Sequence, residues 1–111
     1  MTLLVFMADA TAQGSFSSAI DDLPLMEGLN EAEGGTMVFD SSSGRIVESL
    51  TYGQVSRSRV IQFYSETLPQ LGWFEISPGH FERENEILKI EFSTPSVEMT
   101  LNVLFMLSPS Q

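Results

Sequence analysis

The carboxyl-terminal third of the chain alternates apolar and polar side chains with a period of two, and this pattern restricts the fold most. Every second side chain is apolar in residues 87–94, and residues 97–107 repeat the pattern over a longer run. The apolar positions are Leu88, Ile90, Phe92, Val97, Met99, Leu101, Val103, Phe105 and Leu107. Successive side chains of a strand point to opposite faces of a sheet. The pattern therefore predicts an antiparallel sheet with one buried face and one face in water.

Shorter strand-like segments precede this region. Residues 36–40 and 45–52 are joined by "SSSG", which predicts a hairpin. Residues 73–77 and 80–84 flank a Pro-Gly turn dipeptide.

A single helix is predicted to begin at Ser56, whose hydroxyl can cap the free backbone N–H groups of the first turn. Apolar residues follow at helical spacing: Val60, Ile61, Phe63, Tyr64, Leu68 and Leu71. The helix is expected to end near Leu68, because Pro69 lacks an N–H and its ring clashes with the preceding turn. Gly72 then stands where a positive φ is needed. The chain reverses there, and Trp73 is predicted to pack the corner.

The expected fold class is therefore α+β. We predict an antiparallel sheet of about five strands in ββαβββ order, with one helix packed on one face and three strands after the helix. A chain of 111 residues with 42% apolar residues is long enough for one modest core. Residues 35–108 are expected to form this single domain.

The amino terminus resembles the end of a secretory signal peptide. Residues 2–8 are apolar, and Ala10-Thr11-Ala12 is a small-x-small site ahead of Gln13, although no basic residue precedes the run. We expect residues 1–12 to be a signal-peptide remnant; a first strand or a frayed apolar terminus is the alternative. Residues 13–34 are predicted to form an acidic, extended leader whose "LPLM" segment docks on the domain, because exposed apolar clusters promote aggregation.

Charge and composition exclude several classes of function. With 15 acidic and 5 basic residues the formal net charge is −10, which argues against binding to nucleic acid or an anionic membrane surface. No apolar run reaches the roughly 20 residues that span a bilayer, so the protein is not expected to be integral to a membrane. The absence of cysteine excludes disulfides, thiolate catalysis and Cys-ligated zinc.

No catalytic constellation is recognisable. His80 is the only histidine, and no nucleophile motif accompanies it. The segment "HFERENE" adds Glu82, Glu84 and Glu86, which on one strand would share a face and approach a cation; a solvated edge is the favoured interpretation. We therefore predict no catalytic residue, no metal site and no cofactor.

Glu48 has two interpretations. If its face of residues 45–52 is buried, the carboxylate must be paired or protonated. If Val47, Ser49 and Thr51 face the helix instead, Glu48 is exposed. The small side chains suit close helix packing and favour the second interpretation.

Two groups of residues are candidate binding sites. Tyr64, Trp73 and Phe92 are predicted to line an apolar cleft between helix and sheet, which would suit a small apolar ligand. Leu104 and Met106 fall on the otherwise polar face of the last strand and would bind a protein partner. Alternatively, the "LPLM" segment covers them, and we favour this because that segment must dock somewhere.

The strings "DLPLMEGL", "VFDSSSGRIVE" and "FYSETLPQLGW" resemble a group of small exported bacterial proteins that have no assigned function. The resemblance covers most of residues 21–74, and the last string is its most specific part. It implies a compact α+β domain and an envelope location, and it transfers no catalytic residue.

The sequence thus predicts a non-enzymatic interaction or accessory domain in the periplasm, with a possible protein partner in the cell envelope. A cytoplasmic location is the alternative, and the oligomeric state stays open. A carrier of a small apolar ligand is the second hypothesis for function, and an enzyme is the third.

Overall fold

The computed structural model describes residues 15–94 and 99–110. The predicted signal-peptide remnant, residues 1–12, lies outside the described residues.

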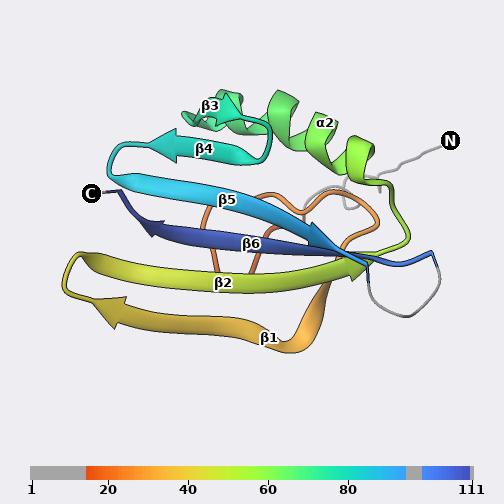
Figure 1. The fold of residues 1–111 in the computed structure, drawn as a ribbon, viewed down its shortest axis with the longest axis horizontal. Helices are drawn as coiled ribbons and strands as arrows, with labels where there is room; N and C mark the ends of the chain where they lie inside the picture. The colour runs from red at the N-terminus through yellow and green to blue at the C-terminus, as the bar shows by residue number, and fades with distance from the viewer. Residues whose placement is uncertain (1–14, 95–98, 111) are drawn as a thin grey trace, which may run out of the picture.

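The described residues form one antiparallel sheet, one α-helix and one short 3-10 helix (Figure 1). In chain order the elements are β1 (Asn30–Ser41), β2 (Gly44–Gly53), α2 (Arg57–Thr67), η1 (Leu68–Leu71), β3 (Phe74–Ser77), β4 (His80–Arg83), β5 (Glu86–Ser93) and β6 (Leu101–Pro109). The strands lie in the order β1-β2-β6-β5-β4-β3, and all neighbours are antiparallel. The α+β class is therefore confirmed.

The expected ββαβββ order is wrong, because four strands rather than three follow the helix. β3 and β4 are separate strands joined by a tight turn, in which Gly79 has a φ of 81°. A second turn, with Glu84 at a φ of 52°, leads from β4 into β5. The helix carries the chain from β2 to the far edge of the sheet, and β3 to β6 return to pair with β2.

Two strands have bounds that the sequence did not predict. β1 starts at Asn30, so residues 30–34 of the expected leader belong to the sheet. β6 starts at Leu101 rather than at residue 97. Met99 has a φ of 63° and is 80% exposed, so it does not lie on the buried face as expected. A left-handed backbone at that position is incompatible with a continuous strand.

The helix follows its local signals. The Ser56 hydroxyl accepts a hydrogen bond of 3.2 Å from the Arg59 N–H, which confirms the predicted cap. The α-helix ends before Leu68, and the chain tightens into η1 around Pro69. Gly72 has a φ of 94°, and its N–H donates to the carbonyls of Leu68 and Pro69. The predicted chain reversal is confirmed.

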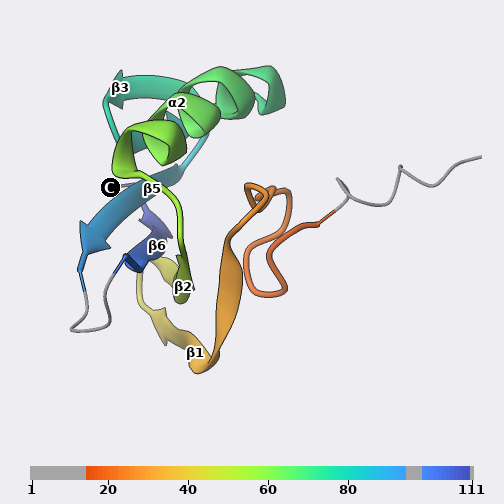
Figure 2. The same ribbon diagram turned by 90° about the vertical axis from the view of Figure 1, so that its right-hand side faces the viewer.

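The described residues form one hydrophobic core, which lies on one face of the sheet. Residues 15–29, here called the leader segment, and α2 both lie on this side, and the opposite side carries no covering element among the described residues (Figure 2). The strands, the helix and the leader segment all contribute to the core, which contains Ile20, Leu23, Met26, Leu29, Val47, Val60, Tyr64, Leu68, Trp73, Phe81, Leu88, Ile90, Leu101, Val103 and Phe105. We call the uncovered side of the sheet the open face.

Candidate functional site

Tyr64 joins the helix to the leader segment. Its side chain is fully buried, and its ring packs edge-on against Phe105 of β6 with 5.3 Å between the centroids. The hydroxyl donates to the Pro24 carbonyl at 2.7 Å and accepts from the Met26 N–H at 3.1 Å. Burial raises the pKa of Tyr64, and the hydrogen bond from Met26 opposes this only in part. The phenol therefore stays protonated, and both of its hydrogen bonds are used within the protein.

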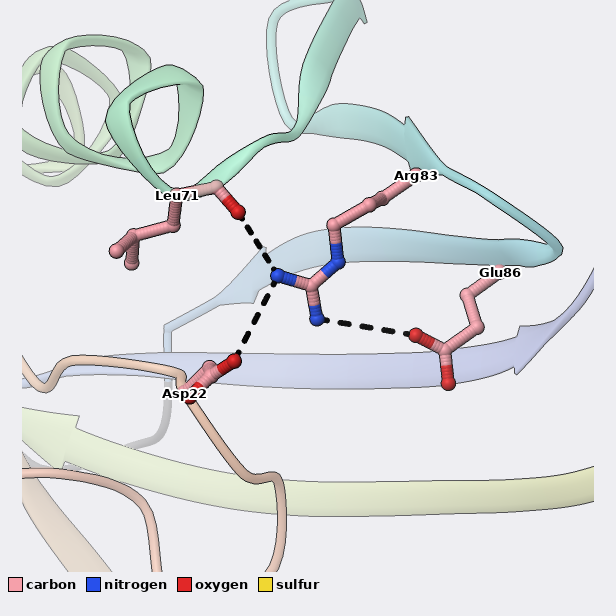
Figure 3. Close-up of polar contacts among 4 residues, drawn as sticks. All are labelled: Asp22, Leu71, Arg83 and Glu86. Carbon is pink, nitrogen blue, oxygen red and sulfur yellow. Dashed lines mark hydrogen bonds and ion pairs between the residues drawn. The ribbon is translucent and has the colours of Figure 1, made fainter.

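Trp73 lies beneath Arg83 at the corner where η1 meets β3. Trp73 is 4% exposed, and the Arg83 guanidinium lies 4.2 Å above its ring centroid. The Arg83 Nη1 donates to the Leu71 carbonyl at 2.9 Å and lies 3.7 Å from the Asp22 carboxylate (Figure 3). Its Nη2 lies 3.9 Å from Glu86. Arg83 thus connects η1, the leader segment and the turn after β4, and Trp73 serves as a core residue, as predicted.

A pocket of about 350 Å³ adjoins Arg83 and Trp73. Its charged lining residues are two cations, Arg45 and Arg83, and two carboxylates, Asp21 and Glu86. Opposite charges are thus equal in number, and the Arg83 donors already face protein oxygens. The pocket therefore shows no preference for one charge class of ligand.

The three aromatic residues of the predicted cleft all contact the core, but a different part of the protein packs over each ring. Tyr64 is covered by the leader segment and Trp73 by Arg83. Phe92 is half-buried, with the Arg57 guanidinium 4.9 Å above its ring centroid. The apolar residues of the leader segment that join Tyr64 in the core are Ile20, Leu23, Met26 and Leu29.

Leu104 and Met106 lie on the open face. Their neighbours Val103 and Phe105 are fully buried on the core side, so by alternation Leu104 and Met106 point the other way. The favoured expectation that "LPLM" covers them is wrong. The apolar residues of that segment pack into the core on the opposite side of the sheet. The apolar face of the helix lies on that side, and the Tyr64 hydroxyl bonds the backbone of Pro24 and Met26 there.

Leu104 and Met106 belong to a larger apolar surface that we call the open-face strip. On β2, Leu50 pairs with Leu104, while Ile46 lies on the same side two alternations away, beyond Glu48. On β1, Met37 and Phe39 pair with Glu48 and Ile46, and they are 54% and 43% exposed. The strip therefore crosses three adjacent strands and consists of Met37, Phe39, Ile46, Leu50, Leu104 and Met106.

A hollow interrupts the strip where β1 departs from regular pairing. The register between β1 and β2 shifts between Glu31 and Thr36, and Gly34 has a φ of 71° there. The resulting pocket of about 300 Å³ is lined by Gly34, Gly35, Thr36, Met37, Glu48, Leu50 and Leu104. A side chain on Gly35 would come within 3.1 Å of the Leu50 Cβ. The glycines thus keep this apolar hollow open.

Among the described residues that line this hollow, Glu48 is the one carboxylate. It is half-buried on the open face, while Val47, Ser49 and Thr51 are buried toward the core. The predicted facing of Val47, Ser49 and Thr51 is therefore confirmed, and the Glu48 carboxylate does not enter the core, although it is half-buried rather than exposed.

The acidic segment after His80 does not gather around a common point. Glu84 lies in a turn with positive φ, so it does not share one strand face with Glu82 and Glu86. His80 Nε2 is 3.7 Å from the Glu82 carboxylate, which is too long for a hydrogen bond. Within residues 15–94 and 99–110, no three His, Cys, Asp or Glu side chains could hold one metal ion.

Sequence reasoning missed two parts of this arrangement. It did not assign Arg83 to Trp73, because ten residues and a turn separate them in the chain. It also did not place Met37 and Phe39 on the strip, because Met37, Val38 and Phe39 are consecutive apolar residues and show no alternation that would assign a face.

No protein-family model, curated protein or solved structure matches this chain. Among the described residues, no helix has the length and apolar character required to cross a membrane.

Proposed function

We propose that the protein is a small, non-enzymatic interaction domain that binds a protein partner through the open-face strip. One observation carries the proposal: six large apolar side chains lie together on a sheet face that neither the helix nor the leader segment covers. Contiguous exposed apolar surface on a small protein marks interaction sites. Ile46 and Leu50 on β2 form its centre, with Leu104 and Met106 on the β6 side and Met37 and Phe39 on the more exposed β1 side.

Charge indicates the chemistry of the partner. Glu48 of β2 pairs with Met106, whereas on β5 Glu91 pairs with Leu104 and Lys89 pairs with Met106, so two carboxylates and one ammonium group border these two side chains. The whole chain carries a net charge of −10. A partner with an apolar patch flanked by Lys or Arg would be attracted and oriented by this arrangement.

A location in the bacterial periplasm is part of the proposal. It rests on the apolar run and small-x-small site before Gln13 and on the resemblance of residues 21–74 to small exported proteins. The packing favours an interaction domain over a carrier, because leader side chains occupy the core between helix and sheet.

The test compares the full chain with a Leu104→Glu/Met106→Glu variant. The matched control is Gln54→Glu/Ser58→Glu, which adds two charges at exposed positions around the helix start. All three proteins are first compared by circular dichroism and urea unfolding. They are then used to capture crosslinked partners from an envelope extract, and bis-ANS fluorescence measures exposed apolar surface.

We expect the wild type and the control to enrich the same partner and to bind bis-ANS equally. The Leu104→Glu/Met106→Glu variant should remain folded and lose both signals. Partner capture that persists in this variant would refute the role of the strip. Failure of the wild type and control to enrich any partner would refute the interaction function.

A further inference from the structure

The two edges of the sheet differ sharply. β3, at one edge, has four residues, a register shift between Glu75 and Ser77, and a proline directly after it. Short edges, irregular pairing and proline all hinder the addition of another strand. β1, at the other edge, has twelve residues, and its last six, Thr36–Ser41, are exposed. Of the two sheet edges formed by the described residues, the β1 edge is therefore the one suited to pairing.

The exposed half of β1 is apolar on both faces. Met37, Val38 and Phe39 are consecutive and are 54%, 46% and 43% exposed. Met37 and Phe39 lie on the open face, and Val38 lies on the core side opposite Val47. The segment contains no lysine or proline, and Asp40 is its one charge. A long apolar edge without these blocking residues is a template for a further strand.

We propose that the β1 edge pairs antiparallel with β1 of a second copy of this chain, around a two-fold axis at Val38. This inference goes beyond the proposed partner function, because it uses the free edge of β1 and leaves the centre of the open-face strip accessible. The two sheets become one continuous twelve-stranded sheet, from six strands in each copy.

The backbone supports this pairing. Ser41 and Gly44 close a two-residue turn and form a hydrogen-bonded pair, so by alternation Phe39 and Met37 also bond to β2. The N–H and C=O groups of Thr36, Val38 and Asp40 therefore point toward the free edge. A two-fold axis at Val38 makes Val38 of each copy exchange both hydrogen bonds with the other.

Side-chain chemistry selects this register. With the axis at Val38, Met37 of each copy faces Phe39 of the other, which gives two favourable sulfur–aromatic contacts. Asp40 then faces Thr36 of the second copy rather than another carboxylate. An axis at Phe39 would place Asp40 against Val38, and an axis at Met37 would place Phe39 against Gly35, where it has no side chain to pack on.

Net charge makes the pairing weak at low salt. Each copy carries −10, so two copies repel one another over the screening length of the solution. The dimer should therefore strengthen as sodium chloride is added.

The chain has no cysteine, so a single introduced cysteine reports its own contact with the second copy. Full chains with Val38→Cys, Met37→Cys, Phe39→Cys or Phe74→Cys are oxidised mildly in 0.5 M salt, a condition with a screening length of about 3–10 Å. In the proposed register the two Val38 Cα atoms are about 5.5 Å apart, within the range that a disulfide spans. Met37 of one copy is offset by two residues, or about 7 Å along the strand, from Met37 of the other copy, and the same holds for Phe39. A disulfide between equal residues would therefore not form at either position.

We expect disulfide-linked dimers from Val38→Cys and none above the Phe74→Cys background from the other two variants. Sedimentation of the wild type should show a dimer that grows with protein and salt concentration. Val38→Lys should abolish this dimer, and Phe74→Lys on the opposite edge should not. Equal crosslinking at all positions, crosslinking at Met37 or Phe39 instead, or a monomeric wild type at high salt would each overturn the proposal.

Discussion

The Tyr64 hydroxyl joins the leader segment to the helix through two hydrogen bonds. It satisfies one backbone acceptor and one backbone donor, at Pro24 and Met26, forty and thirty-eight residues earlier in the chain. Such a buried bond contributes little by itself, but a donor left without an acceptor costs its full desolvation. The leader is therefore held by this oxygen atom in addition to the packing of its apolar side chains in the core.

Tyr64→Phe should lower the free energy of unfolding by about 1–3 kcal/mol, because the Met26 N–H loses its acceptor inside the protein. Urea unfolding at neutral pH measures the change. Tyr52→Phe is the matched control, since Tyr52 is 42% exposed, and we expect a change below about 0.5 kcal/mol. Equal effects of the two substitutions would contradict this account of Tyr64.

The same hydroxyl predicts a pH dependence. Burial raises the pKa of Tyr64 in the folded state above its ordinary value, so the folded chain holds the phenol proton more tightly. This contribution is complete below the unfolded pKa of about 10 and is lost as the pH rises toward the folded pKa. The stability advantage of the wild type over Tyr64→Phe should therefore narrow above about pH 10, by at most about 1.4 kcal/mol per pH unit. An advantage that stays constant up to about pH 11 would refute this.

At the scale of elements, the leader segment and β2 approach most closely at two glycines. A Cβ on Gly53, the last residue of β2, would overlap the Gly28 carbonyl oxygen. Because the obstructing atom is backbone, no side-chain rotation relieves the overlap. The leader segment can lie against this end of β2 only while residue 53 has no side chain.

Gly53→Ala should displace the leader segment, and native-state hydrogen exchange measures this directly. The amides of Ser17, Leu23 and Leu25, which bond within the segment, should exchange faster than in the wild type. Gly34→Ala is the control: its φ of 71° makes the substitution strained by about 1–2 kcal/mol, but no atom lies within 4 Å of the new Cβ. In the Gly34→Ala variant, the amides of the leader segment should stay as protected relative to the other amides as they are in the wild type. Faster leader exchange in both variants alike would show that the close approach is not decisive.

The elements that the sequence predicted are those with local signals. The Ser56 cap, the end of the helix at Pro69 and the reversal at Gly72 depend on neighbours within four residues, and all are confirmed. Period-two alternation likewise placed Leu104 and Met106 away from the core. The start of β1 at Asn30 was not predictable, because residues 30–35 are mostly acidic residues and glycine, which do not favour a strand. They adopt the extended conformation in this sheet by pairing with β2. The side on which "LPLM" docks was predicted wrongly, since both faces of the sheet offer apolar residues and tertiary contacts decide between them.

At the scale of the whole molecule, an asymmetric sheet is combined with a large negative charge. One face is buried by helix and leader, and the other exposes an apolar strip. Like charge between copies limits unspecific association through that strip. The same repulsion acts within each copy and destabilises the compact state, so the charge has opposite effects on solubility and stability.

Added sodium chloride should therefore raise the free energy of unfolding of the monomer. Screening shortens from about 30 Å at 0.01 M to about 3 Å at 1 M, and we expect a gain on the order of 1 kcal/mol across this range. Urea unfolding at low protein concentration measures it, with the Val38→Lys variant used in parallel to exclude any contribution of the proposed dimer.

The matched variant is Glu27→Gln/Glu33→Gln/Glu91→Gln, which removes three exposed carboxylates and changes the net charge from −10 to −7. Because repulsion falls steeply as charge is removed, its stability should be higher at low salt and rise less as salt is added. Potassium chloride should give the same slopes as sodium chloride, since screening depends on ionic strength alone. Equal slopes in the two proteins would mean that salt acts through the apolar surface instead, and that self-repulsion does not limit the stability of this fold.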